Sequence, residues 1–130
     1  MNKIDLHMHT TCSDGKFTPK EIIDEAAKNN VIIISISDHD TTQAYTEQLF
    51  EYAKMHNIRL IPAVEISTQY GKAGIHVLGY NFDLNNEGFK DKLKQIRHFR
   101  HDYLHDVSKL LMWMICLASA AKISFSLRSA

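Results

Sequence analysis

Histidine and carboxylate side chains recur along the chain between residues 7 and 76. Imidazole nitrogens and carboxylate oxygens together are a ligand set for Zn²⁺, Mn²⁺ or Fe²⁺, and such a site requires no thiolate. The residues of this kind are His7, His9, Asp14, Asp38, His39, Asp40, Glu65 and His76. If the fold brings them into one cleft, they predict a metal site able to activate water for hydrolysis.

The first of these residues lie on an alternating segment at residues 3–10. Apolar Ile4 and Leu6 point to one side of an extended chain, and His7 and His9 point to the other. A period of two is typical of a β-strand. We therefore expect a strand with one apolar face and one face that carries the histidines.

The rest of the pattern alternates between helix and strand. Thr18 and Glu21 form a capping box around Pro19, which predicts a helix start. The expected elements are a helix over 19–29, a strand over 31–36, a helix over 42–56, strands over 58–66 and 75–82, and a helix over 86–114. The order β-α-β-α-β-β-α indicates an α/β protein with a largely parallel sheet. The last two strands are too close in sequence for a crossover helix, which favours a hairpin.

The polar residues follow the carboxyl ends of these strands, where α/β proteins build their sites. Each has an ordinary explanation by itself. A His-x-His pair can be incidental, Asp38 can cap the next helix, and His76 can be a core histidine. Four consecutive strands nevertheless deliver such a residue to one edge, and this recurrence favours a shared metal site.

Five motifs give the chain a resemblance to a known family. They are Asp5-Leu6-His7-Met8-His9-Thr10, Ser13-Asp14-Gly15, Ser37-Asp38-His39-Asp40-Thr41, Val64-Glu65 and His76-Val77-Leu78-Gly79-Tyr80. Over about residues 1–108 the chain resembles the PHP (polymerase and histidinol phosphatase) phosphoesterases. It is most similar to their small stand-alone bacterial members, which act on nucleotide phosphates. The resemblance implies a distorted seven-stranded β/α barrel whose mouth binds two or three divalent ions (Mn, Zn or Fe, with Mg as an option).

The resemblance also implies a role for each matching residue. The metal ligands would be His7, His9, Asp14, His39, Glu65 and His76, with Glu65 as the bridging carboxylate. Asp38 and Asp40 would support these ligands from behind. The implied reaction is hydrolysis of phosphomonoesters or small nucleotides by metal-activated water. Cys12 lies close to these motifs, but no activating partner for it is evident in the sequence.

The long helix at 86–114 carries a second group of polar residues. His98, His101 and His105 share one face, with Arg97 and Arg100 beside them. A solvated surface is the interpretation we favour. The alternative is that Arg97 and Arg100 bind substrate phosphate, because guanidinium groups suit phosphate oxygens.

The sequence departs from the family after about residue 108. The family's barrel needs about twice this length, and its later histidine and final Asp-x-His motif have no counterpart here. We therefore divide the chain into a metal-binding domain at 1–108 and an atypical apolar tail at 109–130, as in a truncated or frame-shifted product. A weakened or inactive metal-binding remnant is the alternative to an active enzyme. An amidohydrolase is a further alternative, which the Ser-Asp-His-Asp-Thr motif disfavours.

Composition adds limits on the partners. Fifteen basic residues balance fifteen acidic ones, so nothing indicates a general binder of nucleic acid or membranes. The apolar run at 110–121 is too short to span a bilayer, and Cys12 and Cys116 fit reduced thiols in the cytoplasm. A partial barrel would expose a sheet edge and an apolar face. We therefore expect a cytoplasmic homo-oligomer that acts on a small phosphorylated substrate.

Overall fold

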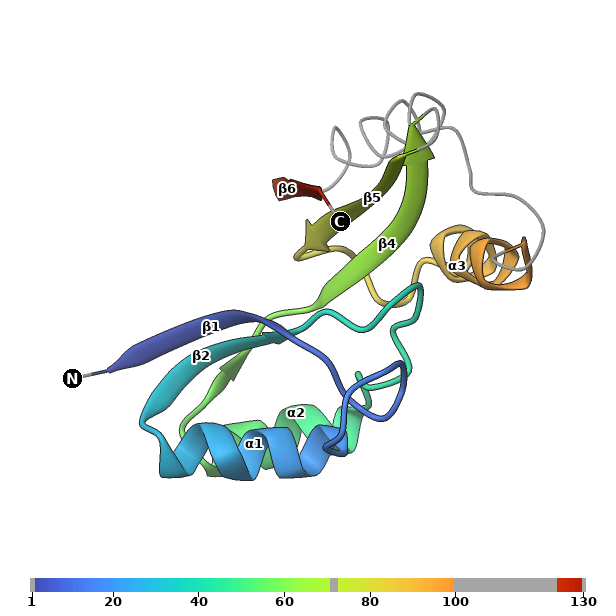
Figure 1. Cartoon of the computed structure of the whole chain (residues 1–130). Coiled ribbons are helices and arrows are strands. Elements are labelled where there is room, and N and C mark those ends of the chain that lie inside the picture. The colour runs from blue at the N-terminus through green and yellow to red at the C-terminus, as the bar shows by residue number, and fades with distance from the viewer. Residues whose placement is uncertain (1, 71–72, 100–123, 130) are drawn as a thin grey trace.

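The structure is a computed structural model that describes residues 2–70, 73–99 and 124–129. Its elements are β1 (Lys3–Met8), α1 (Pro19–Lys28), β2 (Val31–Ile36), α2 (Glu47–Met55), β3 (Arg59–Leu60), β4 (Ala63–Tyr70), β5 (Ala73–Tyr80), α3 (Glu87–Phe99) and β6 (Ser124–Ser129). They form two three-stranded sheets, in the orders β1-β2-β3 and β4-β5-β6 (Figure 1). The mixed α/β character predicted from the sequence is confirmed.

The first sheet is parallel and has α1 and α2 along one face (Figure 1). Its core contains Ile23 of α1, Ile34 and Ile36 of β2, and Ala53 of α2, all at most 1% exposed. The predicted capping box at the start of α1 is present, with Thr18 accepting a hydrogen bond from the amide of Glu21. This half of the molecule therefore follows the helix and strand periodicity of the sequence.

The second helix starts later than predicted. It begins at Glu47 with Thr46 as its N-cap, whereas the sequence pattern placed the start at about residue 42. Residues 41–46 instead form a turn in which the amide of Gln43 donates to the Thr41 hydroxyl at 3.2 Å. The Tyr45 side chain extends from this turn to the strands, where its hydroxyl contacts backbone atoms of Ile36, Ile61 and Ala63. These contacts keep residues 41–46 from joining the helix that follows.

The strand predicted over 58–66 is wrong, because the chain forms two strands there. β3 ends at Leu60 and pairs in parallel with β2, and β4 begins at Ala63 and belongs to the second sheet. Pro62 lies between them and has no amide hydrogen for a ladder. The Tyr45 hydroxyl fills the break: it accepts from the Ala63 amide at 2.7 Å and lies 3.0 Å from the Ile61 carbonyl oxygen.

The second sheet is antiparallel, so a largely parallel arrangement holds only for β1–β3. The predicted hairpin is confirmed as β4 and β5, whose pairing runs from Ala63↔Tyr80 to Tyr70↔Ala73. β6 lies in the region predicted as an atypical tail, where no strand was expected, and it pairs antiparallel with β5. Over the described residues, the second sheet therefore contains three antiparallel strands, and the two sheets do not close into a barrel.

The helix α3 packs beside the second sheet (Figure 1). Phe89, Leu93 and Ile96 form a core with Val64 and Val77 of the hairpin. The predicted continuation of this helix to residue 114 and the domain boundary at 108 lie outside the described residues. The predicted apolar tail at 109–130 also lies outside them, except for residues 124–129. Within the described part of the chain, no helix combines the length and apolar character needed to cross a membrane.

Candidate metal centre

Six of the residues singled out by the sequence lie together where the two sheets meet. They are His7 on β1, His9 and Asp14 in the segment after it, His39 after β2, Glu65 on β4 and His76 on β5. They form three overlapping groups, His7–His9–Glu65, His9–Asp14–His39 and His39–Glu65–His76, each with ligand atoms within 4.8 Å of one another. The gathering expected from the strand ends is therefore present in the fold.

A backbone contact joins the two sheets at this point. His39 and Glu65 form an isolated parallel bridge, with the Asp40 amide donating to the Glu65 carbonyl at 2.9 Å. The Glu65 amide donates to the Asp38 carbonyl at 3.3 Å. This bridge fixes the position of β4 relative to the end of β2, and it thereby places the Glu65 side chain among the histidines.

Glu65 is at the middle of the cluster. Its Oε2 lies 2.7 Å from His7 Nε2 and 3.0 Å from His9 Nε2. Its Oε1 lies 2.8 Å from His76 Nδ1. Both carboxylate oxygens thus face imidazole nitrogens from different strands, as a carboxylate shared between neighbouring ions would.

Asp14 extends the cluster on its open side. Its Oδ1 lies 3.2 Å from His9 Nδ1, and its Oδ2 lies 3.6 Å from His39 Nε2. The side chain of Asp14 is 66% exposed, so it is the ligand candidate closest to solvent. A Cβ atom at the next residue, Gly15, would collide with the backbone carbonyl of His9. Only glycine therefore allows the Asp14 turn to close against His9.

Asp38 holds the backbone behind the histidines. Its Oδ1 accepts from the Thr10 amide and from the Ser13 hydroxyl, each at 2.6 Å. Its Oδ2 accepts from the Thr10 hydroxyl at 2.6 Å. Asp38 is 1% exposed, and it faces three donors rather than the ligand cluster. It therefore orients the segment that carries His9 and Asp14.

Asp40 shapes the turn that follows His39. Its backbone has φ of 53°, a left-handed conformation that aspartate tolerates better than most residues. Its Oδ1 accepts from the Ser67 amide at 2.8 Å. Asp40 thus ties the segment after β2 to β4.

Electrostatics in the cluster favour ionised carboxylates and a neutral His39. Burial lowers the pKa of His39 and outweighs the opposing effect of Glu65 and Asp14. Burial alone would raise the pKa of Glu65, but the hydrogen bonds from His7 and His76 and the other nearby histidines lower it overall. Asp14 behaves in the same way, with His39 and His9 lowering its pKa against burial. A neutral imidazole and charged carboxylates are the protonation states that metal ligands require.

The residues of the cluster fit a bound metal. His39 Nδ1 is buried and has no hydrogen-bond partner among the described residues. His9 Nδ1 is also buried, and its approach to Asp14 is not aligned as a hydrogen bond. His7 Nε2 and His9 Nε2 lie 3.1 Å apart, so two ring nitrogens converge on one point. Buried polar atoms without protein partners are uncommon, and a bound cation would satisfy these ring nitrogens.

The two arginines named from the sequence are not part of this cluster. Arg97 lines a separate cleft between α3 and residues 40–51, and Arg100 lies outside the described residues. His101 and His105 also lie outside the described residues, and His98 is exposed on α3. A role for this helix face in phosphate binding therefore remains a prediction.

Sequence reasoning missed the residues that hold the cluster in place. Thr10 and Ser13 belong to motifs that were recognised, but their bonds to Asp38 depend on a partner 25 or more positions away. Tyr45 carries no distinguishing signal in the sequence.

The geometry agrees with what comparison to known proteins shows. The model of the PHP domain family matches residues 5–118. The 5'-3' exoribonuclease Rnm of Salmonella typhimurium is 40% identical over 92 residues, which cover 70% of this chain and 31% of that protein. The 3',5'-nucleoside bisphosphate phosphatase of Chromobacterium violaceum is 35% identical over 100 residues, covering 77% and 35% of the two chains.

A solved structure extends the likeness to three dimensions. A putative metal-dependent phosphoesterase of Bifidobacterium adolescentis aligns with a TM-score of 0.66 at 28% identity, covering 72% of this chain and 32% of that one. The chain thus spans about a third of the length of the curated relatives that it matches.

Proposed function

The chain belongs to the PHP domain family, and from this membership we propose that it is a metal-dependent phosphoesterase that hydrolyses phosphomonoesters or small nucleotides. The observation that carries the proposal is the Glu65 carboxylate, whose oxygens lie within 3.0 Å of His7, His9 and His76. A nucleotide substrate is supported by the two curated relatives, which are named as an exoribonuclease and a nucleoside bisphosphate phosphatase.

We propose that His7, His9, Asp14, His39, Glu65 and His76 hold two or three divalent ions. Oxygen and imidazole ligands suit Mn²⁺, Zn²⁺ or Fe²⁺, and Mg²⁺ is compatible with the carboxylates. The position of Glu65 in two of the three groups supports a bridging role. Such ions would supply an activated water and neutralise negative charge on the phosphate.

The remaining tasks fall to the chain's own residues. His39, kept neutral by burial, presents a ring nitrogen to the cluster, and the ionised Glu65 provides the negative charge that holds cations there. Asp38 and Asp40 act behind the ligands, as proposed from the sequence, by fixing the Thr10–Ser13 segment and β4. Arg97 is proposed as a contact for substrate phosphate, and Arg100 is proposed from the sequence alone.

The wider architecture is also a proposal. We infer that the two sheets form part of the distorted seven-stranded β/α barrel of the family, in a cytoplasmic protein. Ile4 is 61% exposed and Leu6 is 39% exposed on β1, an edge strand of the first sheet. Exposed apolar side chains on a strand edge favour association, and this supports a homo-oligomer. A monomer by light scattering at micromolar concentration would contradict that part.

The experiment that tests the activity starts with metal analysis of the purified full chain. Hydrolysis of p-nitrophenyl phosphate and of nucleotides is then measured with added Mn²⁺. We expect bound metal and turnover that His39→Ala abolishes. The matched control is His56→Ala, because His56 is a partly exposed histidine at the end of α2, away from the cluster. If the chain binds metal but shows no turnover that His39→Ala abolishes, it is an inactive metal-binding protein instead.

A further inference from the structure

The peptide that joins Leu6 to His7 lies at an irregular point of the first sheet. The pairing of β1 with β2 shifts by one residue there, between the pairs Asp5↔Ile34 and Met8↔Ile36. A bulge of this kind often lies next to an active site, where it redirects a side chain. His7, a proposed metal ligand, is located in the bulge. The parallel ladder therefore leaves the orientation of His7 to other contacts.

Two side chains hold this peptide at its opposite ends. The Tyr80 hydroxyl donates to the Leu6 carbonyl oxygen at 3.0 Å. The His7 amide donates to Asp5 Oδ1 at 3.2 Å. The carbonyl and the amide belong to one planar unit, which also contains the Cα atom of His7. Contacts at both ends of the plane therefore fix the point from which the His7 side chain starts.

Tyr80 is held at the base of the β4–β5 hairpin. It pairs with Ala63, the first residue of β4. Tyr80 and His76 are four residues apart on β5, and side chains at even spacing share one face of a strand. The bond from Tyr80 to Leu6 therefore connects β1 to the strand that carries another proposed ligand.

The two contacts with this peptide are poor candidates for a role in folding. Both are exposed to solvent, and surface interactions of this kind add little to the stability of a fold. Both end on the same peptide, which leads directly into His7. His9 has a separate support, because Asp38 accepts from the amide of adjacent Thr10. The position of His7 explains the arrangement of Tyr80 and Asp5 better than folding does.

We propose that Tyr80 and Asp5 are positioning residues that direct the His7 imidazole at the metal centre. This inference rests on the proposed function, because His7 is a metal ligand there. Neither residue belongs to a candidate ligand group among the described residues. Each acts through the backbone, Tyr80 on the carbonyl of Leu6 and Asp5 on the amide of His7. Loss of a group that orients a ligand typically weakens metal binding by about 10- to 100-fold.

The first test compares metal affinity in tyrosine variants. Mn²⁺ is titrated into the metal-free full chain by isothermal titration calorimetry. Tyr80→Phe removes the hydroxyl and keeps the ring, and we expect it to raise the Kd for Mn²⁺ about tenfold. Tyr52→Phe is the matched control, because the Tyr52 hydroxyl bonds to Asp24 of α1 at 2.6 Å. An unchanged Kd in Tyr80→Phe, or an equal rise in Tyr52→Phe, would overturn the proposal.

Variants of Asp5 separate the effect of position from the effect of charge. Asp5→Asn keeps a side-chain oxygen that can accept from the His7 amide, whereas Asp5→Ala removes it. We expect Asp5→Ala to raise the Kd for Mn²⁺ about tenfold and Asp5→Asn to restore most of the affinity. Asp83→Ala is the control, since Asp83 likewise accepts from the amide two residues ahead, at 2.9 Å. An equal rise in Asp5→Asn and Asp5→Ala would indicate attraction between charges and would refute a positioning role for Asp5.

A spectroscopic measurement distinguishes positioning from a general loss of stability. The visible absorption of the Co²⁺-loaded chain depends on the geometry of the metal ligands. We expect this spectrum to change in Tyr80→Phe and to stay the same in Tyr52→Phe. In EDTA the two variants are expected to melt at similar temperatures. A spectrum in Tyr80→Phe identical to that of the unaltered chain would contradict the proposal.

None of these readouts requires turnover, so this inference and the proposed activity can fail separately. Weaker Mn²⁺ binding by Tyr80→Phe, in a chain that hydrolyses no phosphate ester, would support the positioning role and contradict the activity. Equal Mn²⁺ affinity in Tyr80→Phe and the unaltered chain, with hydrolysis intact, would have the opposite meaning.

Discussion

Asp38 accepts two hydrogen bonds from Thr10, one from the backbone amide to Oδ1 and one from the hydroxyl to Oδ2, each 2.6 Å long. Thr10 is fully buried and Asp38 is 1% exposed. The pair joins the segment after β1 to the segment after β2, where His9 and His39 lie. A buried carboxylate at this position therefore aligns two proposed metal ligands while belonging to none of the candidate ligand groups itself.

Removal of this carboxylate is expected to destabilise the protein. Asp38→Ala leaves the buried Thr10 amide and hydroxyl without their acceptor, and the Ser13 hydroxyl keeps only its contact with Asp14. Each buried donor without a partner costs about 1–3 kcal/mol, so we expect the free energy of unfolding to fall by at least about 2 kcal/mol. Urea denaturation measures the change. Asp83→Ala is the control, because exposed Asp83 accepts one local bond from Asn85, and a loss as large there would contradict the role of Asp38.

A side chain at Gly15 is expected to disturb the Asp14 turn. In Gly15→Ala the new Cβ collides with the His9 carbonyl, so the backbone between His9 and Asp14 must move. We expect weaker Mn²⁺ binding, because two proposed ligands lose their relative position, together with lower thermal stability. Gly74→Ala is the matched control on β5, since nothing lies within 4 Å of a Cβ there. Mn²⁺ titration followed by calorimetry compares the two, and equal affinities would contradict the steric argument.

Metal removal is expected to lower stability through the same cluster. A ligand that binds only the folded state stabilises it by about 2.7 kcal/mol at one hundred times its Kd. We therefore expect EDTA to lower the melting temperature of the metal-loaded chain. In Glu65→Gln this effect should largely disappear, because the carboxylate that faces three histidines is lost. Glu51→Gln, on the surface of α2, should respond to EDTA like the unaltered chain. Thermal denaturation with metal analysis decides between these outcomes.

Tyr45 is expected to give the protein a specific sensitivity to alkaline pH. Burial raises the pKa of its hydroxyl in the folded state, even though backbone amides at Ala63 and Ile36 oppose the shift. Because the folded pKa lies above the unfolded value of about 10, the stability from this group is complete below that pH. It is lost as the pH rises further, since the unfolded chain releases the proton more easily.

Comparison with Tyr45→Phe tests this behaviour. At neutral pH the variant lacks the acceptor of the Ala63 amide and is expected to lose about 1–3 kcal/mol of unfolding free energy. The stability difference between the two proteins should narrow as the pH is raised from about 8 to about 11. Thr46→Ala serves as a control, because it removes the N-cap of α2 and no titratable group, so its loss of stability should not change with pH. A difference that stayed constant with pH would refute the assignment to Tyr45.

The sequence by itself determined the local secondary structure and the kinds of side chain at the site. The alternation around His7 and the Thr18 capping box depend on neighbours in the chain, so periodicity and caps predict β1 and the start of α1. The family motifs also named the six clustered residues correctly as neighbours in space. Their roles as metal ligands stay a prediction.

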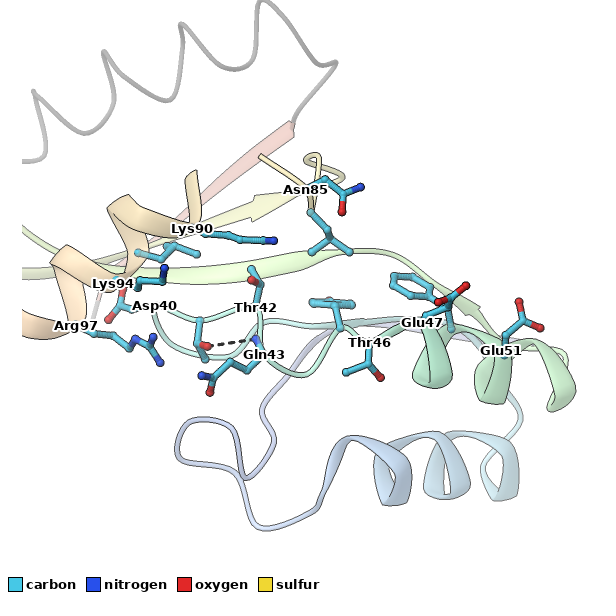
Figure 2. Close-up of a pocket in the computed structure, with 15 residues that line it drawn as sticks. Asp40, Thr42, Gln43, Thr46, Glu47, Glu51, Asn85, Lys90, Lys94 and Arg97 are labelled. Carbon is cyan, nitrogen blue, oxygen red and sulfur yellow. Dashed lines mark hydrogen bonds between the residues drawn. The ribbon is translucent and has the colours of Figure 1, made fainter. Parts of the chain in front are cut away.

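Only the tertiary structure decided how these pieces meet. His7 contacts Glu65 across 58 positions of sequence, and that contact depends on the bridge between His39 and β4. The Tyr45 hydroxyl contacts Ile61 and Ala63 at the point where the chain passes from β3 to β4 of the antiparallel sheet. The local sequence around Pro62 does not predict this contact. The cleft lined by α3 and residues 40–51 (Figure 2) likewise forms only when α3 packs opposite the turn after His39. Such contacts depend on long-range packing, whereas strand and helix periods are properties of a single segment.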